Sequence, residues 1–253
     1  GRPPSDTGAA MSAALPPTID DVAAAARRIA GHAVRTPLVT SPFLDETVGG
    51  RVLLKCENLQ RTGSFKFRGA CNAVAALDEE ARSRGIVAVS SGNHAQGVAE
   101  AARVFGTRAT IVMPADAPAI KRARTERSGA TVVPYDRTGQ DRDDVAEDVV
   151  AETGGAFIHP FNDPFVIAGQ GTVGLEIAED CGARALDPAM VIVPCSGGGL
   201  AGGVTLAVTS AFPTCTPMLV EPEGFDDYVR SLAAGTILGN EARGGSICDA
   251  LLA

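Results

Sequence analysis

The sequence lacks a surplus of positive charge and any long apolar run. Lysine and arginine number 22 against 30 aspartate and glutamate residues, which gives a net charge of −8. Because nucleic-acid-binding surfaces are usually basic, this balance argues against a nucleic-acid partner. The longest apolar runs, such as I-V-A-V and M-V-I-V-P-C, are far too short to span a membrane. Residues 1–10 resemble no signal peptide, and we expect a tag remnant or a disordered leader there.

The sequence also lacks paired cysteines, since none of its six forms a C-x-x-C motif. A chain of 253 residues can bury a sizeable core without disulfides. We therefore expect reduced, mostly buried cysteines in a cytoplasmic protein. The three histidines have no ligand spacing relative to the cysteines, which disfavours a zinc site. These residues are Cys56, Cys71, Cys181, Cys195, Cys215 and Cys248, with His32, His94 and His159.

What the sequence does contain is an alternation of apolar strands with helices of ten or more residues. This pattern predicts an α/β fold built from βαβ units, with mostly parallel sheets covered by helices. A capping box at Thr18 and Asp21 predicts a first helix that ends near Ala33. We expect strands at 51–57, 86–91, 109–114, 131–135, 156–160, 190–194 and 217–222, and further helices at 65–77, 94–105, 119–128, 141–152, 165–180, 200–211 and 226–234.

Lysine is scarce, and one of the three lysines occupies an unusual position. Lys66 falls in the first turn of a predicted helix, within Q-R-T-G-S-F-K-F-R-G-A, where the helix dipole disfavours a cation. A lysine held partly neutral there suits an amine nucleophile or a Schiff base. The alternative is an exposed surface lysine. Lys55 lies in a strand next to Glu57, and Lys121 lies in a basic helix, so we interpret both as structural or solvated.

Two further loops follow buried strands, where the active sites of parallel sheets are found. In S-S-G-N-H-A-Q-G, residues 90–97, Ser90, Ser91 and Asn93 can cap the next helix, or the backbone N–H groups can bind an anion. In P-C-S-G-G-G-L-A-G-G, residues 194–203, consecutive glycines favour a phosphate cradle over a flexible turn. A phosphate cradle, an anion-binding turn and an unusual lysine together point to pyridoxal phosphate (PLP).

The motifs resemble the fold type II PLP enzymes, specifically the threonine/serine dehydratase and serine racemase branch. The matching segments are S-F-K-F-R-G-A, S-S-G-N-H-A-Q-G, I-A-G-Q-G-T, S-G-G-G-L and V-E-P-E-G-F-D-D. The resemblance implies a two-domain, tryptophan-synthase-β-like fold. Residues 11–83 and 158–253 would form the large domain, and residues 84–157 a small mobile domain. Family members continue further, so we expect the C-terminal part of the large domain, with the partner of the pyridine nitrogen, to lie beyond residue 253.

The resemblance also implies roles for individual residues. Lys66 would be joined covalently to PLP and would later take the substrate Cα proton. Phe65 would pack near the cofactor ring, and Asn93 would bond its phenolic oxygen. The substrate carboxylate would be surrounded by Ser90, Ser91, Gly92 and His94. The phosphate would be held by Ser196, Gly197, Gly198, Gly199 and Leu200.

Three more expectations each carry an alternative. Glu221 and Asp227, with the Phe225 carbonyl, resemble ligands of Mg²⁺, Mn²⁺ or Ca²⁺; the alternative is an acidic loop in which Asp226 or Asp227 caps a helix. Arg142 aligns roughly with an arginine that meets a second substrate carboxylate; the alternative is a surface arginine. His159 suits a general base, and the alternative is a hydrogen-bonded structural histidine.

The implied reaction is β-elimination of water from a small hydroxy amino acid. L-threonine would give 2-oxobutanoate and ammonia, and L-serine would give pyruvate and ammonia. The alternatives are serine racemisation with Ser91 as the second base, dehydration of 3-hydroxyaspartate or another 3-hydroxy amino acid, and a non-catalytic PLP-fold binding protein. By the same resemblance we expect a homodimer or a higher homo-oligomer.

Overall fold

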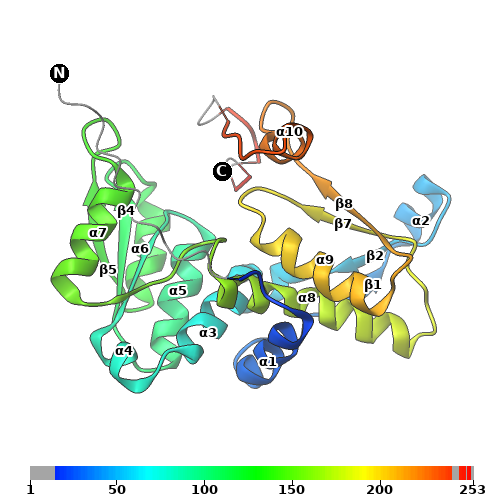
Figure 1. Ribbon diagram of the computed structural model, residues 1–253, viewed down its shortest axis with the longest axis horizontal. Helices are drawn as coiled ribbons and strands as arrows, with labels where there is room; N and C mark the ends of the chain where they lie inside the picture. The colour runs from blue at the N-terminus through cyan, green and yellow to red at the C-terminus, as the bar shows by residue number, and fades with distance from the viewer. Residues whose placement is uncertain (1–14, 241–244, 249, 252–253) are drawn as a thin grey trace.

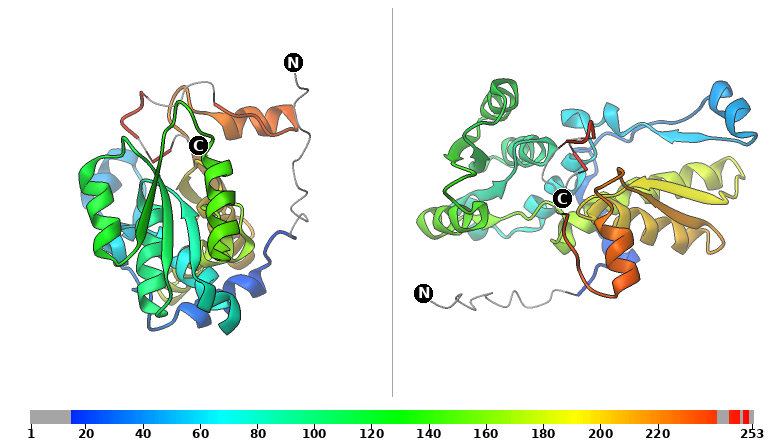
Figure 2. Two further views of the ribbon diagram at one scale, coloured as in Figure 1. Left: turned by 90° about the vertical axis from the view of Figure 1, so that its left-hand side faces the viewer. Right: turned by 90° about the horizontal axis from the view of Figure 1, so that it is seen from above.

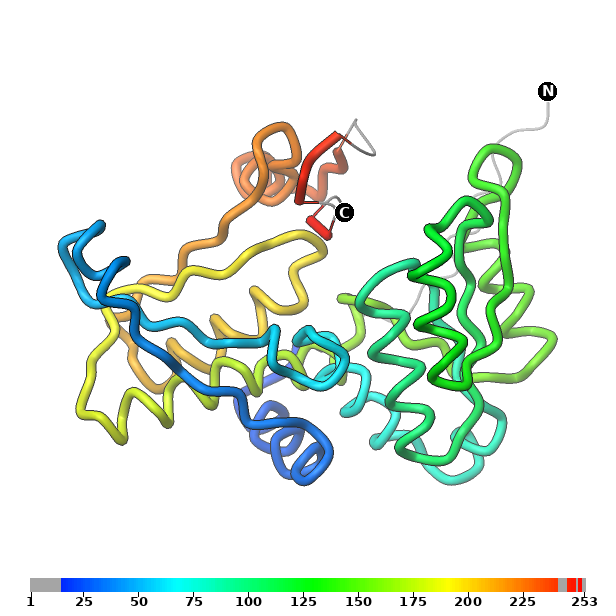
Figure 3. Tube along the Cα trace, turned by 180° about the vertical axis from the view of Figure 1, so that it is seen from behind, coloured from blue at the N-terminus to red at the C-terminus, as the bar shows by residue number. Residues whose placement is uncertain are grey.

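The computed structural model describes residues 15–240, 245–248 and 250–251. Residues 1–10, for which the sequence predicts a leader, lie outside the described part. The described strands lie in two regions: a four-stranded sheet at one end of the molecule, and two two-stranded sheets toward the other end (Figure 1, Figure 3). Helices α3 (Lys66–Ala76) and α8 (Pro164–Ala183) pack against each other. Within the described residues, no helix is long and apolar enough to span a membrane.

The first β region is a four-stranded parallel sheet in the order β5-β4-β3-β6. Its strands are β3 (Ile86–Val89), β4 (Ala109–Pro114), β5 (Thr131–Tyr135) and β6 (Ala156–Phe157). Both faces are covered, because alternate residues of β3 and β4 belong to two separate apolar clusters. One cluster includes α3 and α5 (Asn93–Val104); the other includes α7 (Arg142–Thr153). Figure 2 shows helices on both sides of these strands.

The second β region is smaller and partly open. Strands β7 (Met190–Pro194) and β8 (Thr216–Val220) form a parallel pair, which packs one face against α9 (Gly199–Ala211). Met190, Ile192 and Met218 on these strands are exposed. Helix α10 (Asp227–Ala234) follows β8 (Figure 1).

Close approaches between glycines bring the central helices together. A Cβ on Gly169 of α8 would lie 2.6 Å from Gly69 Cα of α3, and one on Gly203 of α9 would lie 2.6 Å from Gly171 N of α8. No side chain larger than hydrogen fits at these crossings, so α3, α8 and α9 pack with their backbones almost in contact. The remaining helices are α1 (Ile19–Ile29), α2 (Pro42–Val48), α4 (Glu79–Arg84) and α6 (Ala119–Arg127), with the short 3-10 turns η1 (Glu57–Leu59) and η2 (Arg61–Gly63).

The structure confirms the mostly parallel α/β architecture and corrects several local expectations. The capping box at Thr18 and Asp21 is present, but the first helix ends at Ile29 rather than near Ala33. The strand expected at 51–57 is the short β2 (Leu53–Lys55), which pairs antiparallel with an unforeseen β1 (Leu38–Thr40). Helices α2 and α4 were also not predicted.

Candidate active site

The segment from Ile158 to Asn162, which follows β6, joins the three loops that the sequence singles out. The Ile158 carbonyl lies 3.0 Å from His94 Nε2, in the second loop. The Pro160 carbonyl accepts a hydrogen bond of 3.0 Å from Lys66 Nζ. The Phe161 ring lies so close to Gly197 that a Cβ there would be 2.2 Å from it. One turn of chain therefore contacts the lysine, the anion-binding turn and the glycine loop.

Lys66 is the first residue of α3, and Phe65 takes the N-cap position without a side-chain cap. The Lys66 Nζ lies 5.4 Å from the centroid of the Phe65 ring. Burial lowers the pKa of the amine to about 8, and among the described residues no ion pair opposes this effect. The environment agrees with the expectation of a lysine that is held partly neutral.

The second loop turns at Ser90, whose Oγ accepts a hydrogen bond of 3.0 Å from Gly92 N. Gly92 is the N-cap of α5, and no side chain caps this helix. Side-chain capping, one of the two alternatives for this loop, is therefore not seen at α5. Because the first backbone N–H groups of a helix without a side-chain cap lack partners within the helix, they can bind an anion.

His94 is buried at the start of α5. Burial, together with the nearby charge of Lys66, lowers its pKa to about 3, so the imidazole is neutral. The Ile158 carbonyl can only accept, which assigns the hydrogen to Nε2. Nδ1 is then a bare acceptor, and it has no hydrogen-bond partner within the described part of the chain.

The third loop forms the N-terminus of α9. Gly198 is the N-cap, with φ of 81°, a left-handed conformation that favours glycine. A Cβ at Gly198 would also lie 1.6 Å from Tyr228 Oη. Ser196, Gly197 and Leu200 are half-buried, and Gly199 is buried. The loop is a narrow cradle at a helix N-terminus, where backbone N–H groups favour a phosphate.

Of the three residues expected to hold a cation, the two carboxylates accept hydrogen bonds within the protein. Glu221 Oε1 and Oε2 accept hydrogen bonds from Tyr228 N at 2.9 Å and Val229 N at 3.0 Å. Asp227 Oδ1 accepts one from Asn240 Nδ2 at 2.8 Å, and Phe225 is buried. No group of three or more His, Cys, Asp or Glu side chains in the described residues is placed to hold a metal ion. Glu221, rather than Asp226 or Asp227, therefore caps α10, and the cation site stays a prediction.

Arg142 and His159 lie near one another at the edge of the site. His159 Nδ1 accepts hydrogen bonds from Phe161 N at 3.2 Å and Asn162 N at 3.0 Å, so the histidine holds the turn together. Burial lowers the pKa of His159; Asp143 opposes this shift, whereas Arg142 and Lys66 add to it. Arg142 is exposed, with its Nε 3.5 Å from Asp143 Oδ1.

Sequence reasoning missed Pro160, Phe161 and Tyr228. The first two follow β6 and the third follows β8, so their positions after the carboxyl ends of strands were the available signal. Cys195, just before the glycine loop, has its pKa raised to about 11 by burial and by Glu221 and Asp227. It is a protonated and unreactive thiol.

Comparison with characterised proteins agrees with the site. The chain is 49% identical over 218 residues to the L-threo-3-hydroxyaspartate ammonia-lyase of a Pseudomonas species, which covers 86% of the chain and 67% of that protein. It is 47% identical over 218 residues to the L-threonine ammonia-lyase of Thermotoga maritima, covering 86% of the chain and 53% of the relative. Maize serine racemase shares the fold at a TM-score of 0.89 and 41% identity, covering 94% of this chain and 71% of that one. The chain thus spans between half and two thirds of the length of the two ammonia-lyases.

The residues present fit PLP. A phosphate needs a cradle of N–H groups, which the glycine loop offers at the start of α9. The aldehyde needs an amine of lowered pKa, which Lys66 offers. The family described as "pyridoxal-phosphate dependent enzyme" matches residues 29–251. The expected resemblance is confirmed, and the chain belongs to the pyridoxal-phosphate dependent enzyme family, with the fold of its type II members.

Proposed function

We propose that this chain carries out PLP-dependent β-elimination of a small 3-hydroxy amino acid, releasing a 2-oxo acid and ammonia. The observation that carries the proposal is the Lys66 amine. It has a pKa of about 8, and it contacts the same segment, residues 158–162, that also contacts His94 and the glycine cradle. Bound PLP would supply an electron sink for the charge that develops at the substrate Cα. The cradle of Ser196, Gly197, Gly198, Gly199 and Leu200 would hold its phosphate.

The chain's own groups then have definite tasks. Lys66 would hold the cofactor through its amine and, once free, would take the Cα proton, for which a pKa near the working pH is favourable. Phe65 would pack beside the ring, and Asn93 would bond its phenolic oxygen. The backbone of Ser90, Ser91 and Gly92 would bind the substrate carboxylate, with the neutral His94 beside it.

The preferred substrates are L-threonine, giving 2-oxobutanoate, and L-serine, giving pyruvate. One observation favours a second candidate: Arg142 lies close enough to His159 to affect its pKa, and so stands at the edge of the site. An arginine there could pair with the second carboxylate of 3-hydroxyaspartate. Serine racemisation, with Ser91 as the second base, and a PLP-binding protein without activity are the remaining alternatives.

Four further points stay predictions. Residues 84–157 would move as a small domain, a proposal supported by the apolar cluster on one face of the four-stranded sheet, which is built only from residues of this segment. A divalent cation at Glu221, Phe225 and Asp227 competes with the helix cap seen there. The cytoplasmic location and the homo-oligomer rest on the resemblance alone.

The test measures 2-oxo acid formation by the PLP-loaded chain with threonine, serine and 3-hydroxyaspartate. Lys66→Ala should abolish both turnover and the imine absorbance, whereas Lys121→Ala, on α6, should change neither. Chiral analysis of recovered serine separates elimination from racemisation. If the chain binds PLP through Lys66 but forms no 2-oxo acid from any of the three, the binding-protein alternative replaces this proposal.

A further inference from the structure

Tyr228, which no motif predicts, lies directly against the glycine cradle. A Cβ built on Gly198 would be 1.6 Å from its Oη and 2.5 Å from its Cζ, so the phenol end of the side chain faces the N-cap of α9. The ring is half-buried and packs in the apolar cluster that also contains Phe65 and Leu200. Tyr228 therefore contacts the cradle and belongs to the same apolar cluster as the residue that precedes Lys66.

The backbone of Tyr228 is held in place by Glu221. This carboxylate, at the end of β8, accepts hydrogen bonds from both Tyr228 N and Val229 N. Since β8 is paired with β7, and β7 leads into the cradle, the phenol and the glycine loop share one rigid support. The Glu221 cap thereby holds the backbone of Tyr228 at the start of α10.

The Tyr228 hydroxyl lies at the N-terminus of α9, where several backbone N–H donors are also found. The first N–H groups of α9 have no partners within the helix and point to the same end of it. The Tyr228 hydroxyl has no hydrogen-bond partner among the residues that the structure describes. A phenol O–H can donate to a phosphate oxygen, and a charge-assisted bond of this kind is stronger than a neutral one.

We propose that Tyr228 is a further cofactor-binding residue, whose hydroxyl completes the cradle by donating a hydrogen bond to the cofactor phosphate. The inference rests on the proposed function, because it requires that the chain binds PLP. It assigns the side chain a role that the glycine loop alone does not fill: the loop supplies backbone donors, and Tyr228 adds one side-chain donor at Gly198.

The test compares Tyr228→Phe with Tyr135→Phe, which alters the only other tyrosine of the chain, a residue of the four-stranded sheet. The dissociation constants of PLP and of pyridoxal, which lacks the phosphate, are measured by absorbance titration. Loss of one hydrogen bond to a charged group should weaken PLP binding roughly tenfold or more in Tyr228→Phe. Pyridoxal binding should be unchanged, and Tyr135→Phe should leave both constants unchanged.

Three results would overturn the proposal. The first is an unchanged PLP constant in Tyr228→Phe. The second is an equal weakening of PLP and pyridoxal, which would show that the ring only supports the fold. The third is a wild-type chain that does not bind PLP, which would overturn the proposed function as well, so the two failures can be told apart. Thermal unfolding of the ligand-free variants checks that both are folded.

Discussion

Lys66 and Arg68 stand two residues apart on α3, and their surroundings are opposite. Arg68 is fully buried, yet its guanidinium pairs with Glu57 at 2.8 Å and with Glu176 at 2.7 Å. Among the described residues Lys66 donates only to the Pro160 carbonyl, and burial lowers its pKa. Ion pairs stabilise the charged form of Arg68, whereas burial without an ion pair among the described residues favours the neutral form of Lys66.

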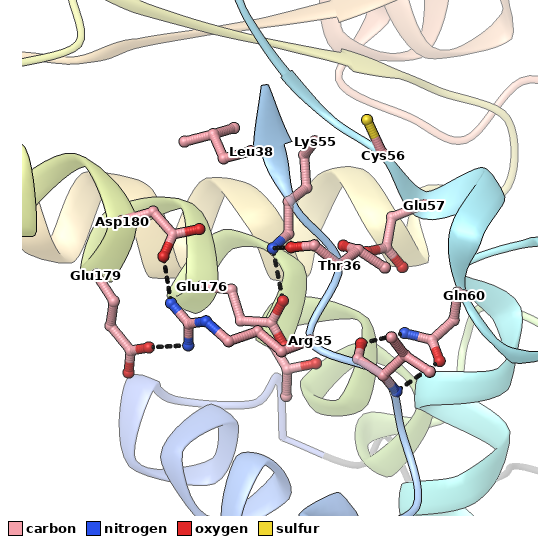
Figure 4. A network of polar contacts seen from close by, with 12 residues as sticks. Arg35, Thr36, Leu38, Lys55, Cys56, Glu57, Gln60, Glu176, Glu179 and Asp180 are labelled. Atoms are coloured by element: carbon pink, nitrogen blue, oxygen red, sulfur yellow. Dashed lines mark hydrogen bonds and ion pairs between the residues drawn. The ribbon is translucent and has the colours of Figure 1, made fainter. Parts of the chain in front are cut away.

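The paired side extends beyond Arg68. Lys55 Nζ lies 2.6 Å from Glu176 Oε2 and donates to the Thr36 carbonyl at 2.6 Å, as Figure 4 shows. The network ties α3 to α8 and η1 below the site. The difference teaches that charge pairing on this side links the elements of the scaffold, whereas burial without a counter-charge among the described residues lowers the pKa of Lys66.

The largest expected effect comes from breaking the paired side. Arg68→Met would leave Glu57 and Glu176 largely buried without their main counter-charge, so the free energy of unfolding should fall by about 3–5 kcal/mol. Urea unfolding measures this change. Arg137→Met, which breaks the exposed pair with Asp116, is the matched control and should cost about 1 kcal/mol or less. Equal losses in the two variants would contradict the comparison.

The unpaired side should show itself in the pH dependence of the ligand-free chain. The pKa of Lys66 falls from 10.5 to about 8 on folding. Between these values the unfolded chain binds more protons than the folded one, so the free energy of unfolding rises with pH, by roughly 3 kcal/mol at about 1.4 kcal/mol per unit. Lys66→Met should lack this rise. Parallel pH profiles for the two chains would show that Lys66 keeps its charge when folded.

Much of this arrangement is local in the sequence and was predictable. The alternation of strands and helices, the position of Lys66 in a first turn and the glycine loop after a buried strand depend on neighbouring residues alone. For the loop that begins at Ser90, the sequence leaves side-chain capping and anion binding equally open. The structure shows no cap there, because the Ser90 hydroxyl instead accepts from Gly92 N and closes a turn.

The rest depends on contacts between distant segments. Glu176 lies 108 residues beyond Arg68, and the Pro160 carbonyl lies 94 residues beyond Lys66. No spacing rule connects such residues, so the sequence predicts the reactive lysine but neither its carbonyl partner nor the network beneath it. The sequence does not predict a role for Tyr228 for the same reason, since only packing brings it to Gly198.

Arg142 tests whether an exposed charge at the edge of the site can act on a substrate. Arg142→Ala should impair elimination from 3-hydroxyaspartate and spare threonine, because only the former has a second carboxylate. The lost charge-assisted bond is worth roughly 1.5–3 kcal/mol, seen as a lower kcat/KM. Arg137→Ala serves as the control on a neighbouring loop. If Arg142→Ala affects both substrates equally, the arginine has no part in recognising the second carboxylate.

The smallest expected effect is that of substituting Glu221, a carboxylate whose partners differ from those of Glu176. Glu176 neutralises Arg68 and Lys55, whereas within the described part of the chain Glu221 accepts only from the backbone N–H groups of Tyr228 and Val229. As a helix cap, Glu221 should contribute about 1 kcal/mol to the free energy of unfolding. Glu221→Ala should lose this amount equally in excess EDTA and in excess Mg²⁺, as measured by thermal or urea unfolding, and Glu221→Gln, which keeps one acceptor oxygen, should lose less. If Mg²⁺ instead stabilises the wild-type chain and not Glu221→Ala, the carboxylate binds a cation, as the family resemblance implies. Glu221 would then resemble Glu176, because both carboxylates would be neutralised by positive charge.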